Sequence, residues 1–119
     1  MQYMLLCYAD EEGWAALGEK GQAAIMDDYA AWAQAIVKSG HYRASAKLGP
    51  TAAATTLREA NGKRLTLDGP FAETKEQLGG FHLIECKDLD EALAIAGRIP
   101  TLRVGCSVEV RPVERASGT

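Results

Sequence analysis

The sequence lacks the marks of a membrane span, a zinc site and a disulfide-stabilised domain. No apolar run approaches the ~18 residues that a membrane-spanning helix needs. The three cysteines, Cys7, Cys86 and Cys106, lie far apart and form no CxxC or CxxH motif. No basic segment with an apolar core precedes Cys7, which argues against a signal peptide. We therefore expect no bound metal, three reduced thiols and a cytoplasmic protein that does not bind membranes.

Positive charge is also scarce. Thirteen lysines and arginines stand against 16 acidic residues, which gives a net charge of −3. Proteins that bind nucleic acid usually carry a basic patch, so direct nucleic-acid binding is disfavoured. No GxGxxG or P-loop motif occurs, and we expect no organic cofactor. Acidic residues gather in the first 40 positions, which we interpret as a solvated helix face.

Short strands and amphipathic helices alternate along the 119 residues, a length that fits a single domain over residues 1–119. Apolar or alternating patterns predict strands over residues 2–9, 41–48, 80–86 and 106–113. Asp10 is expected to cap a short helix that breaks near Gly18 and Gly21. A stripe from Ile25 to Ile36 at a 3.6-residue period predicts a long helix that Gly40 ends.

A second helix is expected to begin after Asp88, because Glu91 follows three residues later as in a capping box. Leu89, Leu93 and Ala96 are expected to form its apolar face, and Pro100 to end it. Both helices then have an apolar side that needs a sheet to cover it.

Residues 55–68 carry a strong hairpin signal. Asn61-Gly62 is a favoured two-residue turn, because both central positions require a positive φ. Counting outward from this turn places Ala60 opposite Lys63, and Glu59 opposite Arg64 as a complementary pair. The register of the two strands is therefore specified by the turn and by charge.

Without this hairpin the order of elements is βαββαβ, the ferredoxin-like α+β arrangement, with two helices on one face of an antiparallel sheet. The opposite face of that sheet lacks a cover within one chain. Two copies that press these faces together would bury both, so we expect a homodimer that forms a dimeric α/β barrel.

The segment Asp68-Gly69-Pro70-Phe71-Ala72-Glu73-Thr74-Lys75-Glu76 and the residues up to Phe81 follow the hairpin. This string resembles the signature of the DGPF (DGPFAETKE) family within the YCII-related superfamily. Tyr3-Met4-Leu5-Leu6 at the start and Val108-Glu109-Val110 near the end are also similar to that family. The resemblance extends over most of the chain.

The resemblance implies a ferredoxin-like fold, a dimeric α/β barrel and a regulatory setting, since members often occur beside extracytoplasmic-function sigma factors. A sigma factor is therefore an expected partner. Some relatives resemble dehydrochlorinases or muconolactone isomerases in fold, and the superfamily is associated with a histidine and an aspartate in a cleft. Here Asp68 is present, but Tyr29 stands at the helix position where the histidine is expected.

Three residues are candidates for chemistry. Asp68 ends a strand before Gly-Pro, where its carboxylate either accepts loop N–H groups or faces the barrel mouth as a general base. Tyr29 lies on the apolar helix stripe, as a core residue or as a hydroxyl that donates to a ligand. His82 shares a strand face with Ile84, as a satisfied interior group or as a catalytic one.

Three further residues are candidates for ligand binding. Glu73 and Lys75 alternate in sign, which is typical of a solvated loop or of a lid that holds a polar ligand. Phe71 is expected to anchor this loop to the core. Gly79-Gly80 would allow a hinge or a close approach of another backbone.

Three functions remain open at this point. The first is a small-ligand-binding or regulatory module. The second is a cofactor-independent lyase or isomerase that uses Asp68 as general base in the barrel cleft. The third is a structural dimer with a filled interior. An open pocket where Asp68, Tyr29 and His82 converge would favour chemistry.

Overall fold

The computed structural model describes residues 1–114. Its elements in chain order are β1 (Gln2–Ala9), α1 (Glu11–Ala16), α2 (Gly18–Lys38), β2 (Tyr42–Lys47), the 3-10 turn η1 (Thr51–Ala53), β3 (Thr55–Ala60), β4 (Lys63–Asp68), β5 (Gln77–Glu85), α3 (Leu89–Ala96), the 3-10 turn η2 (Pro100–Val104) and β6 (Ser107–Pro112).

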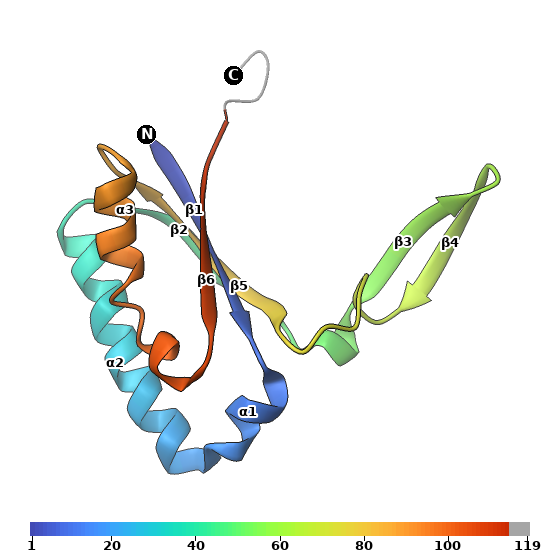
Figure 1. Cartoon of the computed structure of the whole chain (residues 1–119), viewed down its shortest axis with the longest axis horizontal. Helices are drawn as coiled ribbons and strands as arrows, with labels where there is room; N and C mark the ends of the chain where they lie inside the picture. Colours follow the sequence, from blue (N-terminus) through green and yellow to red (C-terminus); the bar gives the residue numbers. More distant parts are fainter. Residues whose placement is uncertain (115–119) are drawn as a thin grey trace.

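The main sheet has the strand order β2-β5-β1-β6 and is antiparallel throughout (Figure 1). β3 and β4 form a separate two-stranded ribbon between β2 and β5. Without that ribbon the strands have the order expected for a ferredoxin-like α+β fold, so this prediction is confirmed. Leu5 at the centre of β1 pairs with His82 on one side and Val110 on the other.

Both long helices cover the same face of the sheet. Trp32 and Ile36 of α2 and Ala92 and Ala96 of α3 are buried against Leu5 and its neighbours. The Trp32 indole N–H donates to the Ile95 carbonyl at 3.0 Å, which joins α2 to α3. The molecule measures 18 Å along its shortest axis, which suits one helix layer on one sheet.

The local signals for the helices succeed in part. Asp10 caps α1 by accepting from the Glu12 amide, and the Asp88 carboxylate accepts from the Glu91 amide. The predicted helix break is confirmed at Gly18, whose φ of 71° separates α1 from α2, and is wrong at Gly21, which lies inside α2. Tertiary contact along this 21-residue helix outweighs the roughly 1 kcal/mol that an interior glycine costs.

The expected apolar face of α3 is also partly wrong. Leu89 and Leu93 are about half exposed, whereas Ala92 and Ala96 are buried. Small side chains let α3 lie close to the sheet and to Trp32, so the helix turns its alanines inward. Gly97 caps its end, and Pro100 begins the next turn rather than ending α3.

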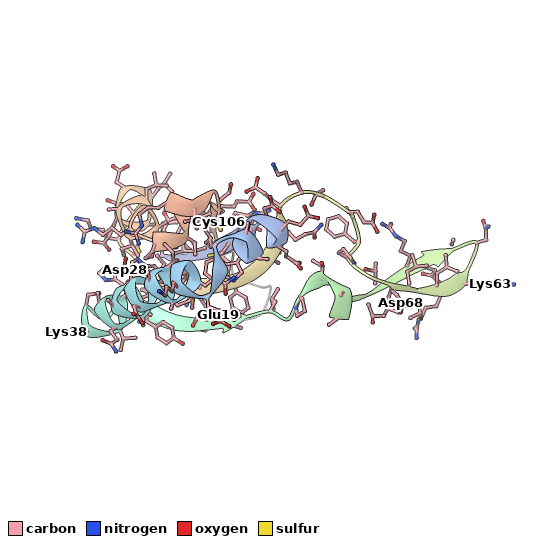
Figure 2. The ribbon with its side chains drawn as sticks, turned by 90° about the horizontal axis from the view of Figure 1, so that it is seen from below. Glu19, Asp28, Lys38, Lys63, Asp68 and Cys106 are labelled. Carbon is pink, nitrogen blue, oxygen red and sulfur yellow. The ribbon has the colours of Figure 1, made fainter. Side chains whose placement is uncertain are left out.

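The hairpin prediction is confirmed in its bounds and its register. Ala60 pairs with Lys63 and Glu59 with Arg64, around the positive φ angles of Asn61 and Gly62. The ribbon projects from the end of the main sheet as an arm, which we define as residues 55–68 (Figures 1 and 2).

The glycine pair of the signature segment lies within β5 rather than at a hinge. A Cβ at Gly80 would lie 2.7 Å from the Ala46 carbonyl oxygen of β2, closer than protein atoms allow. Glycine is therefore required where β2 and β5 pair, and the close approach is within the chain. No helix among residues 1–114 is both long and apolar enough to cross a membrane.

Candidate functional site

The structure brings Tyr29 and His82 together on the helix-covered face of the sheet. The Tyr29 hydroxyl and His82 Nε2 share a hydrogen bond of 2.5 Å, although the residues are 53 positions apart. α2 supplies the phenol and the central strand β5 supplies the imidazole. Two rigid elements thus hold this pair, which we call the Tyr29–His82 dyad.

Two further side chains fix the geometry of the dyad. The Trp32 ring meets the His82 ring edge to face, with centroids 4.8 Å apart, which is a favourable aromatic arrangement. The Cys7 thiol of β1 lies 3.8 Å from the Tyr29 hydroxyl oxygen, within range of a weak hydrogen bond. The phenol therefore lies between a thiol and an imidazole, and one proton chain can connect all three groups.

Burial decides the charge state of these groups. Removal from water lowers the pKa of His82, because burial disfavours the imidazolium. Burial raises the pKa of Tyr29, and the neighbouring Cys7 raises it further. Burial also raises the pKa of the Cys7 thiol. At neutral pH the cluster therefore consists of a neutral imidazole, a neutral phenol and a protonated thiol.

His82 also lines an open groove between α2 and β2, with a volume of about 440 Å³. Ala33, Ile36 and Val37 of α2 give it an apolar wall. Ser45 lies opposite His82 in the pairing of β2 with β5 and adds a hydroxyl. Gln34, Lys38 and Tyr42 complete the lining.

The two ring nitrogens of His82 have different surroundings. Nε2 is bonded to Tyr29, whereas Nδ1 makes no hydrogen bond within residues 1–114. No buried side-chain nitrogen or oxygen in that part of the chain lacks a partner, so Nδ1 must be accessible to solvent. Since His82 lines the groove, a ligand there can reach its ring.

Asp68 lies apart from the dyad within one chain. It ends β4 at the base of the arm, in the separate two-stranded ribbon, and is exposed (Figure 2). Its carboxylate accepts no hydrogen bond from residues 1–114, so the expected capping of loop amides is not seen. The backbone makes this turn instead, since Gly69 at φ 98° donates its N–H to the Ala54 carbonyl at 2.7 Å.

The signature loop after Asp68 is held by its own polar groups. The Gln77 side-chain amide donates to the carbonyl oxygens of Ala72 and Thr74, and Thr74 donates to the Glu76 carbonyl. Glu73 and Lys75 are exposed on this loop. The expectation that Phe71 anchors the loop to the core is wrong, because its side chain is 76% exposed.

Sequence reasoning missed two members of the site. The sequence predicts Cys7 only as a reduced thiol, and Ser45 carries no motif. The strand register alone could have found Ser45, since it places that residue beside His82. The other histidine forms a separate cluster, in which His41 bonds Ser39 through Nδ1 and Glu91 through Nε2.

Fold and site together define a small α+β protein with a buried Tyr–His dyad beside a half-apolar groove. The chain belongs to the YCII-related domain family, whose model matches residues 1–116. An uncharacterized protein of Rhizobium meliloti (strain 1021) is 44% identical over 114 residues, which cover 95% of this chain and 92% of that relative.

A solved structure shares the fold. It is the 5-chloro-2-hydroxyhydroquinone dehydrochlorinase of Burkholderia phenoliruptrix AC1100 in complex with 2,5-dihydroxybenzoquinone. The similarity has a TM-score of 0.57 at 12% identity and covers 98% of this chain and 96% of the other. At this identity the likeness establishes the architecture. Within residues 1–114 no three metal-binding side chains lie close enough to hold an ion.

Proposed function

We propose that the protein is a small-ligand-binding module and that the ligand occupies the groove between α2 and β2. The observation that carries this proposal is the bonding of His82, which lines the groove, with Nε2 held by Tyr29 and Nδ1 without a hydrogen bond within residues 1–114. A fixed ring with one free nitrogen is a preorganised polar anchor. The apolar wall from α2 favours a small, mostly apolar molecule that carries one hydroxyl or carbonyl group.

Nuclear magnetic resonance of the two histidines tests this proposal. Phenol and 2,5-dihydroxybenzoquinone serve as probes, and the imidazole signals of His82 and His41 are followed during the titration. We expect the His82 signals to move with saturation while those of His41 stay constant. His82→Gln should abolish saturable binding, whereas His41→Gln should retain it. Equal responses of both histidines, or of neither, would refute the proposal.

A second function is supported by the charge state of the dyad. A neutral imidazole whose Nε2–H donates to the Tyr29 oxygen has Nδ1 free to accept a proton from a ligand, as a lyase or isomerase without a cofactor requires. Within one chain His82 is better placed than Asp68 to act as this general base. His82 lines the groove, whereas Asp68 lies on the arm.

Chloride release from 5-chloro-2-hydroxyhydroquinone separates the possible bases. If His82 is the base, His82→Gln abolishes turnover and Asp68→Asn leaves it within about threefold. If Asp68→Asn abolishes turnover and His82→Gln does not, Asp68 is the general base. Absence of turnover in the unmodified protein would leave ligand binding as the function.

We also propose that the working form is a homodimer, the dimeric α/β barrel of the DGPF group. Met4, Leu6, Phe81 and Leu83 alternate with the core positions of β1 and β5, so they lie on the sheet face that no helix covers. Sedimentation equilibrium should show dimers, and Leu6→Glu should produce monomers with an unchanged circular dichroism spectrum. A monomeric unmodified protein would contradict this association.

A further inference from the structure

The arm carries apolar side chains that its own subunit does not cover. Leu57, Leu65 and Leu67 are 63%, 42% and 45% exposed. The two ends of the arm are joined to each other, because Thr56 donates to the Gly69 carbonyl and Gly69 donates its N–H to the Ala54 carbonyl. A two-stranded ribbon by itself is marginally stable in water, and exposed leucines on it are typical of a contact surface.

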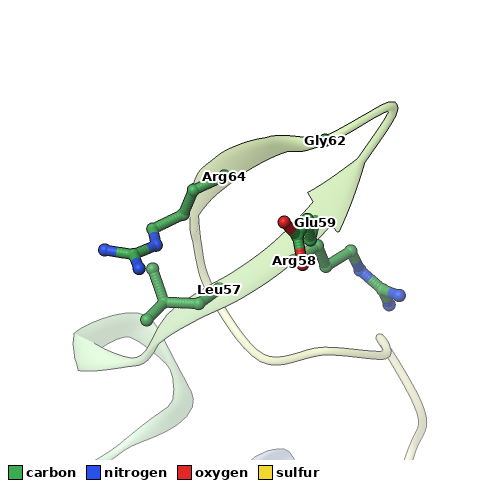
Figure 3. A pocket seen from close by; sticks show the side chains of 5 residues that line it. All are labelled: Leu57, Arg58, Glu59, Gly62 and Arg64. Carbon is green, nitrogen blue, oxygen red and sulfur yellow. The ribbon is translucent and has the colours of Figure 1, made fainter.

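The outer half of the arm is basic. Residues 58–64 contain three bases, Arg58, Lys63 and Arg64, against one acid, Glu59. A concavity of about 480 Å³ lies on this part of the arm and is lined by Leu57, Arg58, Glu59, Gly62 and Arg64. In Figure 3 the side chains of Leu57 and Arg64 point to the same side of the ribbon. Arg58, Lys63, Leu65 and Leu67 lie together on the other face, because Arg58 pairs with Leu65 and side chains alternate along each strand. A partner that fits this second face offers both apolar contact and negative charge.

The chain itself contains a surface of that kind. Glu12 of α1 and Glu19 and Asp27 of α2 are exposed and form no ion pair within residues 1–114. The neighbouring Met26 is 42% exposed and adds apolar area. We call these four residues the acidic helix surface. Residues 10–38 together carry six acids against two bases.

The arm cannot reach the acidic helix surface of its own subunit. Figure 2 shows Lys63 at the far tip of the arm, beyond Asp68 and well away from Glu19 and Asp28. A contact between the two complementary surfaces therefore requires a second copy. In a pair with twofold symmetry the contact forms twice, because each copy gives an arm and receives one.

We propose that the arm of one subunit docks on the acidic helix surface of a second copy of this chain. Leu65 and Leu67 of the arm cover Met26 and its neighbours, while Arg58 and Lys63 on the same face of the arm meet Glu12 and Glu19. This surface is separate from the open sheet face, so the proposal does not depend on the barrel interface or on the ligand groove.

Paired charge reversals test the proposal. One variant carries Arg58→Glu and Lys63→Glu on one face of the arm, and the other carries Glu12→Lys and Glu19→Lys on the helices. A control with Lys87→Glu and Arg98→Glu makes the same change of net charge as the arm variant elsewhere on the exposed surface. Self-association of each variant and of an equimolar mixture is measured by fluorescence-detected sedimentation at low and high salt.

We expect each reversed variant alone to self-associate at least tenfold more weakly, because like charges then meet in both contacts. The control should associate as the unmodified protein does. The mixture should regain the original affinity within about threefold, since each arm then meets a helix surface of opposite charge, and high salt should reduce all these differences.

Two results would overturn the proposal. Unchanged self-association in both reversed variants would mean that the arm serves a different protein. Weakening of both without recovery in the mixture would mean that the two surfaces do not meet. Thermal unfolding of each variant verifies its fold, and Leu6→Glu reports separately on the sheet face.

Discussion

Replacing Tyr29 by phenylalanine tests the dyad most directly, because it removes one oxygen and keeps the ring. The hydroxyl bonds His82 Nε2 at 2.5 Å, and His82 is only 9% exposed. Leaving a buried polar atom without its partner costs about 1–3 kcal/mol. For 119 residues the entropy of unfolding is roughly 250 cal/mol/K, so 1 kcal/mol shifts Tm by about 4 °C. We therefore expect Tm to fall by about 4–12 °C.

Differential scanning calorimetry at fixed protein concentration measures this change, with Tyr42→Phe as the matched control. The Tyr42 hydroxyl lies 3.4 Å from Ser45 Oγ in an exposed bond, so its removal should change stability by less than about 0.5 kcal/mol. The imidazole signals of His82 should also shift in Tyr29→Phe and not in the control. Equal effects of the two substitutions would refute the dyad as a buried hydrogen-bonded unit.

Two other predictions concern the same core. Above pH 6.5 His82 is neutral in both states, and as pH falls below 6.5 the unfolded chain binds a proton that the folded chain resists. Stability should then fall by up to about 1.4 kcal/mol per pH unit until the folded pKa is reached. Urea unfolding from pH 7.5 to 5 should lose this slope in His82→Gln and keep it in His41→Gln. Leu5→Ala, at a fully buried position, should cost about 2–5 kcal/mol in the same assay, whereas Leu93→Ala should cost below about 1.

The sequence predicts best where short-range chemistry decides the structure. The hairpin is one example, because a turn that needs two positive φ angles fixes the strand register from within four residues. The caps at Asp10 and Asp88 are others, since a carboxylate that accepts a nearby N–H depends on no distant contact. These local signals predict the order of strands and helices, and that order predicts the ferredoxin-like fold.

Prediction from sequence fails where the buried face of an element depends on the residues that pack against it. α3 contains both large and small apolar residues, and its packing on the core that includes Trp32 decides that Ala92 and Ala96 turn inward. The prediction that Phe71 anchors the loop is wrong for a different reason. An aromatic residue in a loop is a plausible anchor, but the Gln77 and Thr74 hydrogen bonds already hold this loop, so its ring is left in solvent.

The candidate site was also predictable only in part. Tyr29 and His82 could be selected as candidates from their positions on a helix stripe and a strand face, yet their contact depends on how α2 lies across β5. That packing gives the site its chemistry, because it bonds one ring nitrogen to a phenol and places His82 in the lining of a groove. The helix supplies the phenol and the strand supplies the imidazole, and the phenol orients the ring. Asp68, on the separate ribbon, makes no part of this contact within one chain.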